Sequence, residues 1–254
     1  MRIDGKAAVI TGSGTGVGRE TALALAQLGC HVAINYSRSR EEAEQTCAEV
    51  KAKGVKAVAV RADVARDADC RALIDAAVRA FGRLDVLVNN AGTTTFVPHG
   101  DLEALGEDDW QRIMGVNLLG PFQCARAARS ALEADGGGCI VNVSSIAGIR
   151  AMGSSLPYCA SKAALNNLTI ALARALAPKI RVNAVAPGFI TGRWLQEGLG
   201  AAYESVKKFQ ESRSPLQRVC DPRDVADAIV SLITGSDLVT GQILAVEGGI
   251  LIGN

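Results

Sequence analysis

The 254-residue chain has no Cys-x-x-Cys pair, no long apolar run and almost no net charge. Its formal net charge is +1, so a basic surface of the kind that binds nucleic acid is not expected. Because no stretch of about 18 apolar residues occurs, neither a membrane span nor a signal peptide is predicted. We therefore expect a soluble cytoplasmic protein.

The chain also lacks the side-chain spacing of a metal site. Its cysteines have no close histidine partner, which favours reduced thiols in an intracellular protein over a disulfide framework or a zinc site. No metal is predicted. Neither histidine, His31 or His99, falls in any of the motifs described below. The cysteines are Cys30, Cys47, Cys70, Cys124, Cys139, Cys159 and Cys220.

Short apolar runs alternate with helical stretches along the chain. With 48% hydrophobic and 21% charged residues, the composition is sufficient for a core. Strands alternating with helices and joined by short polar turns indicate parallel units with right-handed crossovers. No linker or repeat occurs, so the prediction is one α/β domain over residues 1–254, a doubly wound Rossmann sheet with helices on both faces. Its seven parallel strands are expected at 7–10, 31–35, 56–61, 84–88, 139–143, 181–186 and 242–246.

A glycine-rich turn follows the first apolar run. It reads Thr-Gly-Ser-Gly-Thr-Gly-Val-Gly from Thr11 to Gly18, and a helical pattern begins at Arg19. Glycines let the backbone approach a ligand, and the N–H groups at a helix start bind phosphate oxygens. Val17 stands where the pattern Gly-x-Gly-x-x-Gly requires glycine, so that pattern is not met. A tight structural turn is the alternative.

The residues after the second strand bear on the choice of dinucleotide. An acidic residue there would bond the ribose hydroxyls of NAD, but the chain has Tyr36, Ser37 and Arg38, with no carboxylate before Glu41. An arginine beside a hydroxyl suits a 2′-phosphate. NADP(H) is therefore favoured over NAD(H), although Arg38 is alternatively a solvated turn residue.

Later strands also end in polar turns, where ligands bind in sheets of this kind. In the turn from Asn89 to Gly92, an Asn amide can tie neighbouring strands and small residues leave room for a ribose. Ser144 and Ser145 follow the fifth strand, and Pro187 to Thr191 follow the sixth. Each turn taken alone is also compatible with a purely structural role.

Two segments depart from the simple alternation. A long helix is predicted over 108–134, and Pro121 should disturb it near Asn117. Asn117 is then either a local hydrogen-bond plug or a site residue. The 192–214 segment mixes large apolar and polar residues and resembles a small helical flap that could close over a substrate. Ordinary packing explains its aromatic residues equally well.

Tyr158 and Lys162 lie four residues apart in a segment with no Gly or Pro from Ala163 to Ala177, which predicts one helix beginning near Pro157. They therefore share a face, about 5 to 6 Å apart at Cβ. A nearby positive charge favours an ionised phenol, so the pair could exchange a proton. A helix-start tyrosine beside a solvated lysine is the alternative.

In order and spacing, these motifs resemble the short-chain dehydrogenase/reductase family over nearly the whole chain, and most of all its 3-oxoacyl-[acyl-carrier-protein] reductases. Sugar and alcohol dehydrogenases are further relatives. The motifs that carry the resemblance are Thr11 to Gly18, Asp63, Asn89 to Gly92, Asn117, Ser145, Tyr158 with Lys162, and Pro187-Gly188. The small basic turn at 177–180 is shorter than is usual in the family.

The resemblance implies an NADP(H)-dependent oxidoreductase that moves hydride between nicotinamide and a carbonyl or secondary alcohol, such as a 3-oxoacyl thioester. Tyr158 would exchange the proton, with its pKa lowered by Lys162 and by the nicotinamide charge. Lys162 would bond the ribose, Ser145 the carbonyl oxygen, and Asn117 a water that connects Lys162 to solvent. No histidine is implied in catalysis.

The resemblance also implies the cofactor contacts. Asp63 would touch the adenine, Asn90 the adenosine-side ribose, and Ile190 with Thr191 the carboxamide. The glycine loop offers no basic residue, unlike that of many NADP-specific members. The full predicted cofactor set is Gly12, Ser13, Thr15, Gly16, Val17, Gly18, Tyr36, Ser37, Arg38, Asp63, Val64, Asn90, Ala91, Gly92, Tyr158, Lys162, Pro187, Gly188, Ile190 and Thr191.

Other functions remain open. A non-catalytic dinucleotide-binding sensor or scaffold needs the glycine loop but not the phenol. A sugar or alcohol dehydrogenase using NAD, or an epimerase or lyase, would fit the same fold. The helix that carries Tyr158 is apolar nearly all round, which predicts burial on two sides. The family's usual homotetramer would supply the second side.

Overall fold

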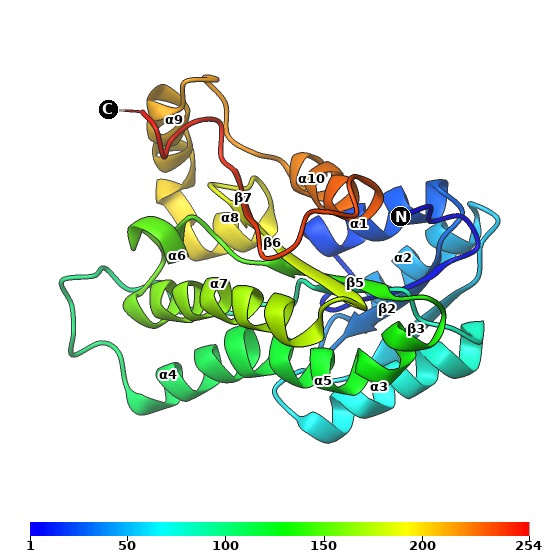
Figure 1. Cartoon of the computed structure of the whole chain (residues 1–254). Coiled ribbons are helices and arrows are strands. Elements are labelled where there is room, and N and C mark those ends of the chain that lie inside the picture. Colours follow the sequence, from blue (N-terminus) through cyan, green and yellow to red (C-terminus); the bar gives the residue numbers. More distant parts are fainter. Residues whose placement is uncertain (254) are drawn as a thin grey trace.

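Parallel strands form the centre of the molecule. Within residues 1–253, which the computed structural model describes, one seven-stranded sheet has the order β3-β2-β1-β4-β5-β6-β7. It lies between two layers of helices (Figure 1), which confirms the predicted doubly wound architecture. The strands are β1 (Ala7–Ile10), β2 (His31–Tyr36), β3 (Ala57–Arg61), β4 (Val86–Asn89), β5 (Gly138–Val143), β6 (Ile180–Pro187) and β7 (Ile243–Val246).

The helices follow the strands as the alternation predicts. The first begins within the glycine turn, three residues earlier than expected from the pattern. They are α1 (Gly16–Gln27), α2 (Arg40–Lys51), α3 (Asp67–Phe81), α4 (Glu107–Met114), α5 (Gly120–Ala134), α6 (Ala147–Arg150), α7 (Leu156–Leu176), α8 (Arg193–Leu199), α9 (Tyr203–Arg213) and α10 (Pro222–Thr234). A 3-10 turn, η2 (Gly200–Ala202), joins α8 to α9.

Two apolar cores lie on opposite faces of the sheet. Successive side chains of a strand point to opposite faces, and accordingly Ala8 and Ile10 belong to one core while Val9 belongs to the other. Helices α1, α2 and α10 cover the first face, and α3, α5 and the end of α7 cover the second. The cysteines are all buried free thiols.

The predicted long helix is interrupted where Pro121 led us to expect a disturbance. Between α4 and α5 lies one turn of π-helix, η1 (Gly115–Leu119), and Pro121 stands in the first turn of α5. A π-turn places an extra residue in the helix and changes the direction of its side chains. Asn117 lies in this turn and is fully buried.

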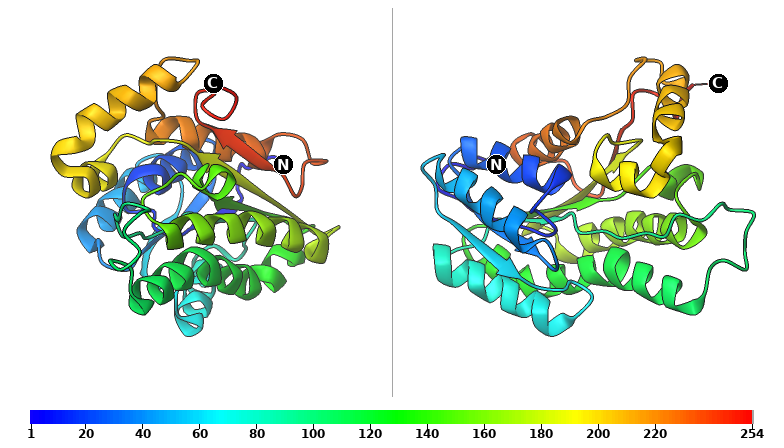
Figure 2. Two further views of the ribbon diagram at one scale, coloured as in Figure 1. Left: turned by 90° about the vertical axis from the view of Figure 1, so that its left-hand side faces the viewer. Right: turned by 180° about the vertical axis from the view of Figure 1, so that it is seen from behind.

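Helices α8 and α9 lie at one end of the sheet, beside the end of the chain (Figure 2). Figure 2 shows α8 and α9, in yellow and orange, beside the C-terminal residues. The hydroxyl of Ser214 donates to the Gly248 carbonyl at 2.8 Å, which joins the end of α9 to that tail. In the part of the chain described, no helix combines the length and apolar character needed to cross a bilayer.

Candidate active site

A cleft of about 2050 Å³ runs along the carboxyl ends of the strands. Its walls come from the glycine turn after β1, the turn after β2, and the turns after β4, β5 and β6. Residues from the 192–214 segment and from the loop after β4 form its outer side. The predicted turns are therefore brought together at one edge of the sheet, as expected for a parallel fold.

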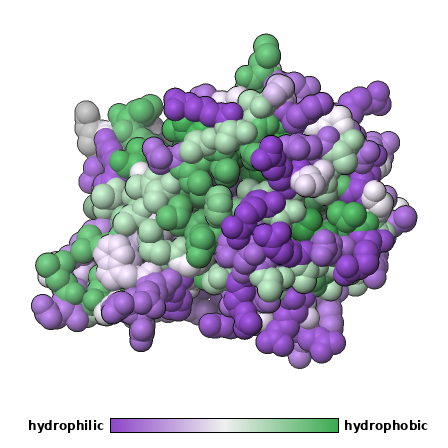
Figure 3. All heavy atoms as spheres, turned by 60° about the horizontal axis from the view of Figure 1, so that its bottom comes forward, coloured by the Kyte–Doolittle hydropathy of each residue, from purple (hydrophilic) through white to green (hydrophobic). Residues whose placement is uncertain are grey.

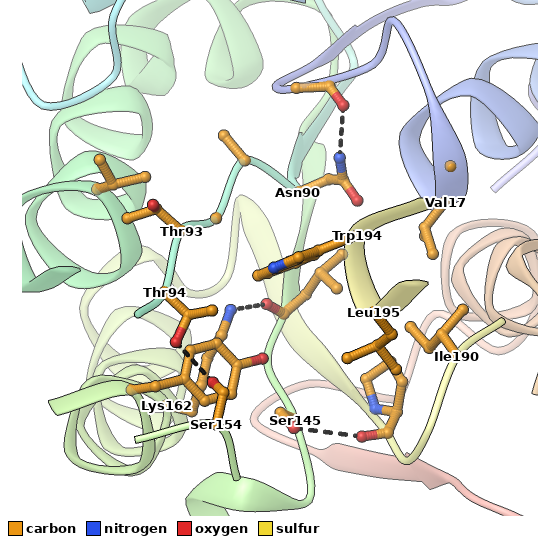
Figure 4. Close-up of a pocket in the computed structure, with 18 of the residues that line it drawn as sticks. Val17, Asn90, Thr93, Thr94, Ser145, Ser154, Lys162, Ile190, Trp194 and Leu195 are labelled. Atoms are coloured by element: carbon orange, nitrogen blue, oxygen red, sulfur yellow. Dashed lines mark hydrogen bonds between the residues drawn. The ribbon is translucent and has the colours of Figure 1, made fainter. Parts of the chain in front are cut away.

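The glycine turn is held in place by two asparagines. The Gly12 N–H donates to Asn35 Oδ1 at 3.0 Å, and Asn90 Nδ2 donates to the carbonyls of Thr11 and Gly12 at 2.9 Å each (Figure 4). Gly12 has φ of +61°, and a Cβ there would lie 3.0 Å from Ala91 Cα. The turn is thus fixed between β2 and β4, with its backbone close to the cleft.

Not every predicted cofactor residue lines the cleft. Thr15, Gly16 and Val17 do, but Ser13, Gly18 and Tyr36 do not. The Ser13 hydroxyl is buried and donates to the Ile10 carbonyl at 2.7 Å. A Cβ on Gly18 would collide with the amide of Asn90, and Tyr36 packs against the core. These three residues pack on the side of the turns that faces the interior, away from the cleft.

Asn35 is a site residue that the sequence motifs did not identify. Besides accepting from Gly12, it donates through Nδ2 to the Ala62 carbonyl at 3.0 Å, and its backbone N–H donates to Ser13 Oγ at 3.0 Å. It lines the cleft although it is nearly fully buried. A polar residue near the end of an apolar strand was the only signal in the sequence.

The outer end of the cleft is basic. Ser37, Arg38 and Arg61 line it, and both arginines are exposed. Neither guanidinium forms an ion pair with a residue in 1–253. Asp63 also lines this end, with its Oδ1 accepting from the Ala65 N–H at 3.0 Å, beside the buried Val64. The cleft therefore offers positive charge where β2 ends.

The turn after β4 ties the sheet together as its asparagines suggested. Asn89 Nδ2 donates to Asn142 Oδ1 on β5 at 2.9 Å. The backbone N–H groups of Asn90 and Ala91 donate to Thr11 Oγ1 at 2.9 and 3.0 Å. Together with Gly92, Asn90 and Ala91 line the middle of the cleft.

Ser145 and Lys162 line the cleft together (Figure 4), and Tyr158 lines it as well. Lys162 is only 3% exposed and donates to the Val143 carbonyl at 2.7 Å. Ser145 Oγ accepts from the Ala147 N–H at 3.1 Å and donates to the Pro187 carbonyl at 3.4 Å. The structure thus brings three of the four predicted catalytic side chains together.

Burial dominates the pKa of Tyr158 in the chain alone. Burial raises this pKa to about 12, and a hydrogen bond with Ser145 opposes the rise only in part. Burial also lowers the pKa of Lys162 from 10.5 to about 8. The ammonium lies 5.7 Å from the centre of the phenol ring and donates to Val143. The lowering of the Tyr158 pKa by Lys162 together with a nicotinamide charge stays a prediction.

Asn117, the fourth predicted catalytic residue, does not line the cleft. Its Nδ2 donates to the Thr93 carbonyl at 2.9 Å and to Ser161 Oγ at 3.0 Å, and its Oδ1 accepts from the Thr93 N–H at 2.8 Å. Both amide hydrogens are used within the protein. The side chain thus forms a local hydrogen-bond plug that holds residue 93 against α7, and its predicted place beside a water stays a prediction.

The 192–214 segment reaches over the cleft from the other side. Figure 4 shows Trp194 and Leu195 pointing into it, and the rings of Trp194 and Tyr158 meet edge-on at 6.4 Å. Arg193 Nη1 lies 3.1 Å from Glu42 Oε1, so an ion pair links α8 to α2. The predicted residues Pro187, Gly188, Ile190 and Thr191 also line this part.

Comparison with known proteins places this geometry in a family. The family model described as enoyl-(acyl carrier protein) reductase matches residues 12–251. A ketoacyl reductase of the granaticin polyketide synthase from Streptomyces violaceoruber is 43% identical, over 95% of this chain and 94% of the relative. The crystal structure of a short-chain dehydrogenase/reductase from Burkholderia xenovorans has a TM-score of 0.90 at 38% identity, covering 98% of each chain.

The chain belongs to the short-chain dehydrogenase/reductase family. It is therefore an NAD(P)-dependent oxidoreductase, and the predicted resemblance is confirmed. Another short-chain dehydrogenase/reductase of known structure is a gluconate 5-dehydrogenase from Burkholderia cenocepacia in complex with NADP and tartrate. That structure has a TM-score of 0.89 at 34% identity and covers 100% of this chain and 98% of its own.

Proposed function

We propose that this short-chain dehydrogenase/reductase uses NADPH to reduce the keto group of a 3-oxoacyl thioester to a secondary alcohol. The observation that carries this proposal is the shared wall formed by Ser145, Tyr158 and Lys162 in a cleft that also contains the glycine turn. The similarity to a ketoacyl reductase supports the choice of substrate class.

Each side chain has a role suited to its surroundings. Bound NADPH supplies the hydride. Tyr158 gives its phenolic proton to the carbonyl oxygen, and a pKa near 12 keeps that proton in place at neutral pH. Ser145 donates to the same oxygen and orients it. Lys162, whose pKa is lowered to about 8, is still mainly cationic at pH 7 and holds the ribose on the nicotinamide side.

The outer end of the cleft favours the 2′-phosphate of NADP(H). Arg38 and Arg61 are exposed there without an acidic partner among residues 1–253, and the neighbouring Ser37 provides a hydroxyl. Hydrogen bonds to charged groups contribute about 1.5 to 3 kcal/mol each. Arg38→Gln should therefore lower kcat/KM with NADPH by about tenfold or more and leave kcat/KM with NADH nearly unchanged. Equal losses with both cofactors would contradict the preference.

The substrate end suits an acyl chain better than a sugar. Its large apolar side chains include Phe96, Met152, Trp194, Leu195 and Leu199, and its polar ones include His99, Arg150 and Arg193. Apolar surface of this kind gains free energy when it covers methylene groups, whereas a polyhydroxylated substrate needs several convergent polar partners. A panel of acetoacetyl-CoA, simple ketones and sugar acids, each with NADPH, should show the highest kcat/KM for the thioester.

Tyr158→Phe tests the proposed chemistry directly. It removes one oxygen and should reduce turnover of acetoacetyl-CoA by roughly 10² to 10⁴-fold, because general acid catalysis contributes about that factor. NADPH binding, measured by fluorescence titration, should stay within a fewfold of wild type. If the wild-type protein binds NADPH but oxidises none across the panel, a sensor or scaffold is the better interpretation. Retained cofactor without net redox change would indicate an epimerase or lyase.

An exposed apolar face supports the predicted assembly of several copies. Figure 3 shows apolar residues across the middle of the side formed by α3, α4, α5 and α7. Exposed apolar residues of these helices and of η1 are Leu119 and Phe122, which are 48% and 37% exposed, and the alanines Ala163 and Ala171 of α7. We therefore propose a homotetramer that buries this side. A monomer by light scattering would exclude it.

A further inference from the structure

We infer that Asn166 is a positioning residue, which fixes Ser145 relative to Tyr158 by tying residues 143–148 to α7. The inference rests on the proposed function, because it assigns Asn166 a part in the same proton transfer. Asn166 itself touches neither of the two hydroxyl groups. Its effect would be carried through the backbone on either side of Ser145.

Asn166 continues the catalytic face of α7. Tyr158, Lys162 and Asn166 are spaced four residues apart and so stand one above the other along the helix. Lys162 and Asn166 both bond to the chain that follows β5. Lys162 Nζ donates to the Val143 carbonyl at 2.7 Å, just before the two serines.

The amide of Asn166 spans Ser145. Its Oδ1 accepts from the Ser144 hydroxyl at 2.6 Å, and its Nδ2 donates to the Gly148 carbonyl at 3.3 Å. One partner therefore precedes Ser145 and the other follows it. The Ser144 hydroxyl also lies 3.3 Å from the Lys162 carbonyl and is buried. Both serines line the cleft, but the Ser144 hydroxyl is engaged with α7.

The backbone at Gly148 lies against the backbone of α7, next to the hydrogen bonds of Asn166. A Cβ on Gly148 would lie 2.5 Å from the carbonyl carbon of Lys162 and 2.7 Å from the Ala163 nitrogen, so loop and helix already touch. The Ser145 hydroxyl bonds to the Pro187 carbonyl at 3.4 Å and to the Ala147 N–H within its own turn. The backbone on either side of Ser145 is held to β6, and the side chain of Asn166 joins both of these flanks to α7.

The chemistry is sensitive to this position. A hydrogen bond with Ser145 lowers the pKa of Tyr158 against the effect of burial, and a displacement of about 1 Å at a reacting group can cost 100-fold in rate. The other titratable side chains next to Tyr158 are Lys162 and Cys159, and His99 lies 3.9 Å from the Cys159 sulfur. None of these groups is changed in the variants that follow.

Asn166→Ala is the main test, with Asn167→Ala as matched control. Asn167 is the next residue on α7 and is exposed in the single chain, on the face of Ala163 and Ala171, so light scattering should confirm that its variant assembles as the wild type does. With acetoacetyl-CoA and NADPH, Asn166→Ala should lower kcat by about tenfold or more, while the Kd for NADPH stays at the wild-type value. In oxidation of the corresponding 3-hydroxyacyl thioester, kcat rises with pH as Tyr158 ionises. Asn166→Ala should move this rise to higher pH, because Tyr158 loses the support of Ser145.

Two further variants separate positioning from general damage. Ser144→Ala removes one of the two bonds and should produce the same changes in kcat and pH profile to a smaller degree. The double variant Ser144→Ala/Asn166→Ala should have a kcat close to that of Asn166→Ala, because both changes break the same contact. Asn166→Asp keeps the acceptor for Ser144 and should recover part of kcat. If Asn166→Ala fails to fold, Ser144→Ala with its pH profile takes its place.

The inference is overturned if the wild type is active but Asn166→Ala matches Asn167→Ala in kcat and pH profile. It is equally overturned if the loss of kcat in Asn166→Ala is fully explained by a smaller fraction of folded protein and the pH profile of kcat is the same as in the wild type. Failure of the proposed function looks different, since wild type itself would then reduce no thioester, or Tyr158→Phe would retain turnover.

Discussion

The two sides of the cleft are attached to the fold in different ways. Residues 143–166 join a buried strand end to a long helix through direct backbone contact and several buried hydrogen bonds. Helix α8, opposite, has no fully buried residue, and Gly192 and Gly200 at its ends have φ of +129° and +52°. Its ion pair to Glu42 joins side chains that are 56% and 37% exposed. Segments with so little burial open at a small cost in free energy.

This difference suits the proposed reaction. Proton transfer requires fixed distances, which the 143–166 side provides. Entry of a cofactor and of a long acyl substrate requires a wall that can move, and α8 can do so on its flanking glycines. Substitutions of the same chemical kind should therefore have large effects on the first side and small effects on the second.

The largest effect is expected for Gly148→Ala. The new methyl group would lie 2.5 to 2.7 Å from backbone atoms of Lys162 and Ala163, which cannot turn away as a side chain can. Overpacking of this kind costs about 1 to 3 kcal/mol of unfolding free energy or more, and we expect the upper part of that range. Urea denaturation measures the loss, and kcat should fall by about 100-fold. If Gly148→Ala has the stability and turnover of the wild type, the contact between Gly148 and α7 is not rigid.

Lys162→Met should produce an effect that depends on pH. Since burial lowers the pKa of Lys162 from 10.5 to about 8, the unfolded chain binds a proton between these values that the folded chain has released. The free energy of unfolding of the wild type should therefore gain up to about 3 kcal/mol relative to the variant as the pH rises through this window.

The difference between the two proteins is the quantity to measure, because the buried thiols titrate in both. Denaturation in urea at pH 7.5 and 9.5 would supply it. If the free energy of unfolding changes with pH by the same amount in the wild type and in Lys162→Met, the ammonium of Lys162 is not desolvated. The variant should be inactive at both pH values, since it also loses the group proposed to hold the ribose.

The smallest effect is expected for Gly198→Ala in α8. A methyl group there would overlap the ring of Phe96, but this ring belongs to a loop and can turn aside. The free energy of unfolding should change by less than about 1 kcal/mol, and kcat should stay close to wild type while KM for the thioester rises. A loss as large as that of Gly148→Ala would mean that α8 is as firmly attached as α7.

The sequence was sufficient to predict the fold because each strand and its turn are local patterns. Periodicity gave all seven strands, and Pro121 gave the interruption of the long helix, although not the π-turn that accommodates it. The residues of the cleft were predicted from turns at strand ends, which the parallel topology brings to one edge.

What could not be predicted depends on contacts between distant parts of the chain. Asn35 and Asn166 look ordinary in the sequence, and only the fold places them beside the glycine turn and Gly148. The raised pKa of Tyr158 was also missed, because a lysine four residues away can be read from the sequence whereas burial cannot. Ser13 and Tyr36 lie in the predicted turns but face the interior, and this too depends on burial in the folded chain.

The buried cysteines offer a practical consequence. They occur in both cores and in α7, and none is paired. A maleimide added to the folded protein can react only where the chain opens, so the order in which the thiols become labelled reports how each layer separates from the sheet. Mass spectrometry of the labelled peptides would thus compare the rate of local opening at Cys159, next to Tyr158, with the rate at the distant Cys30. No new cysteine has to be introduced.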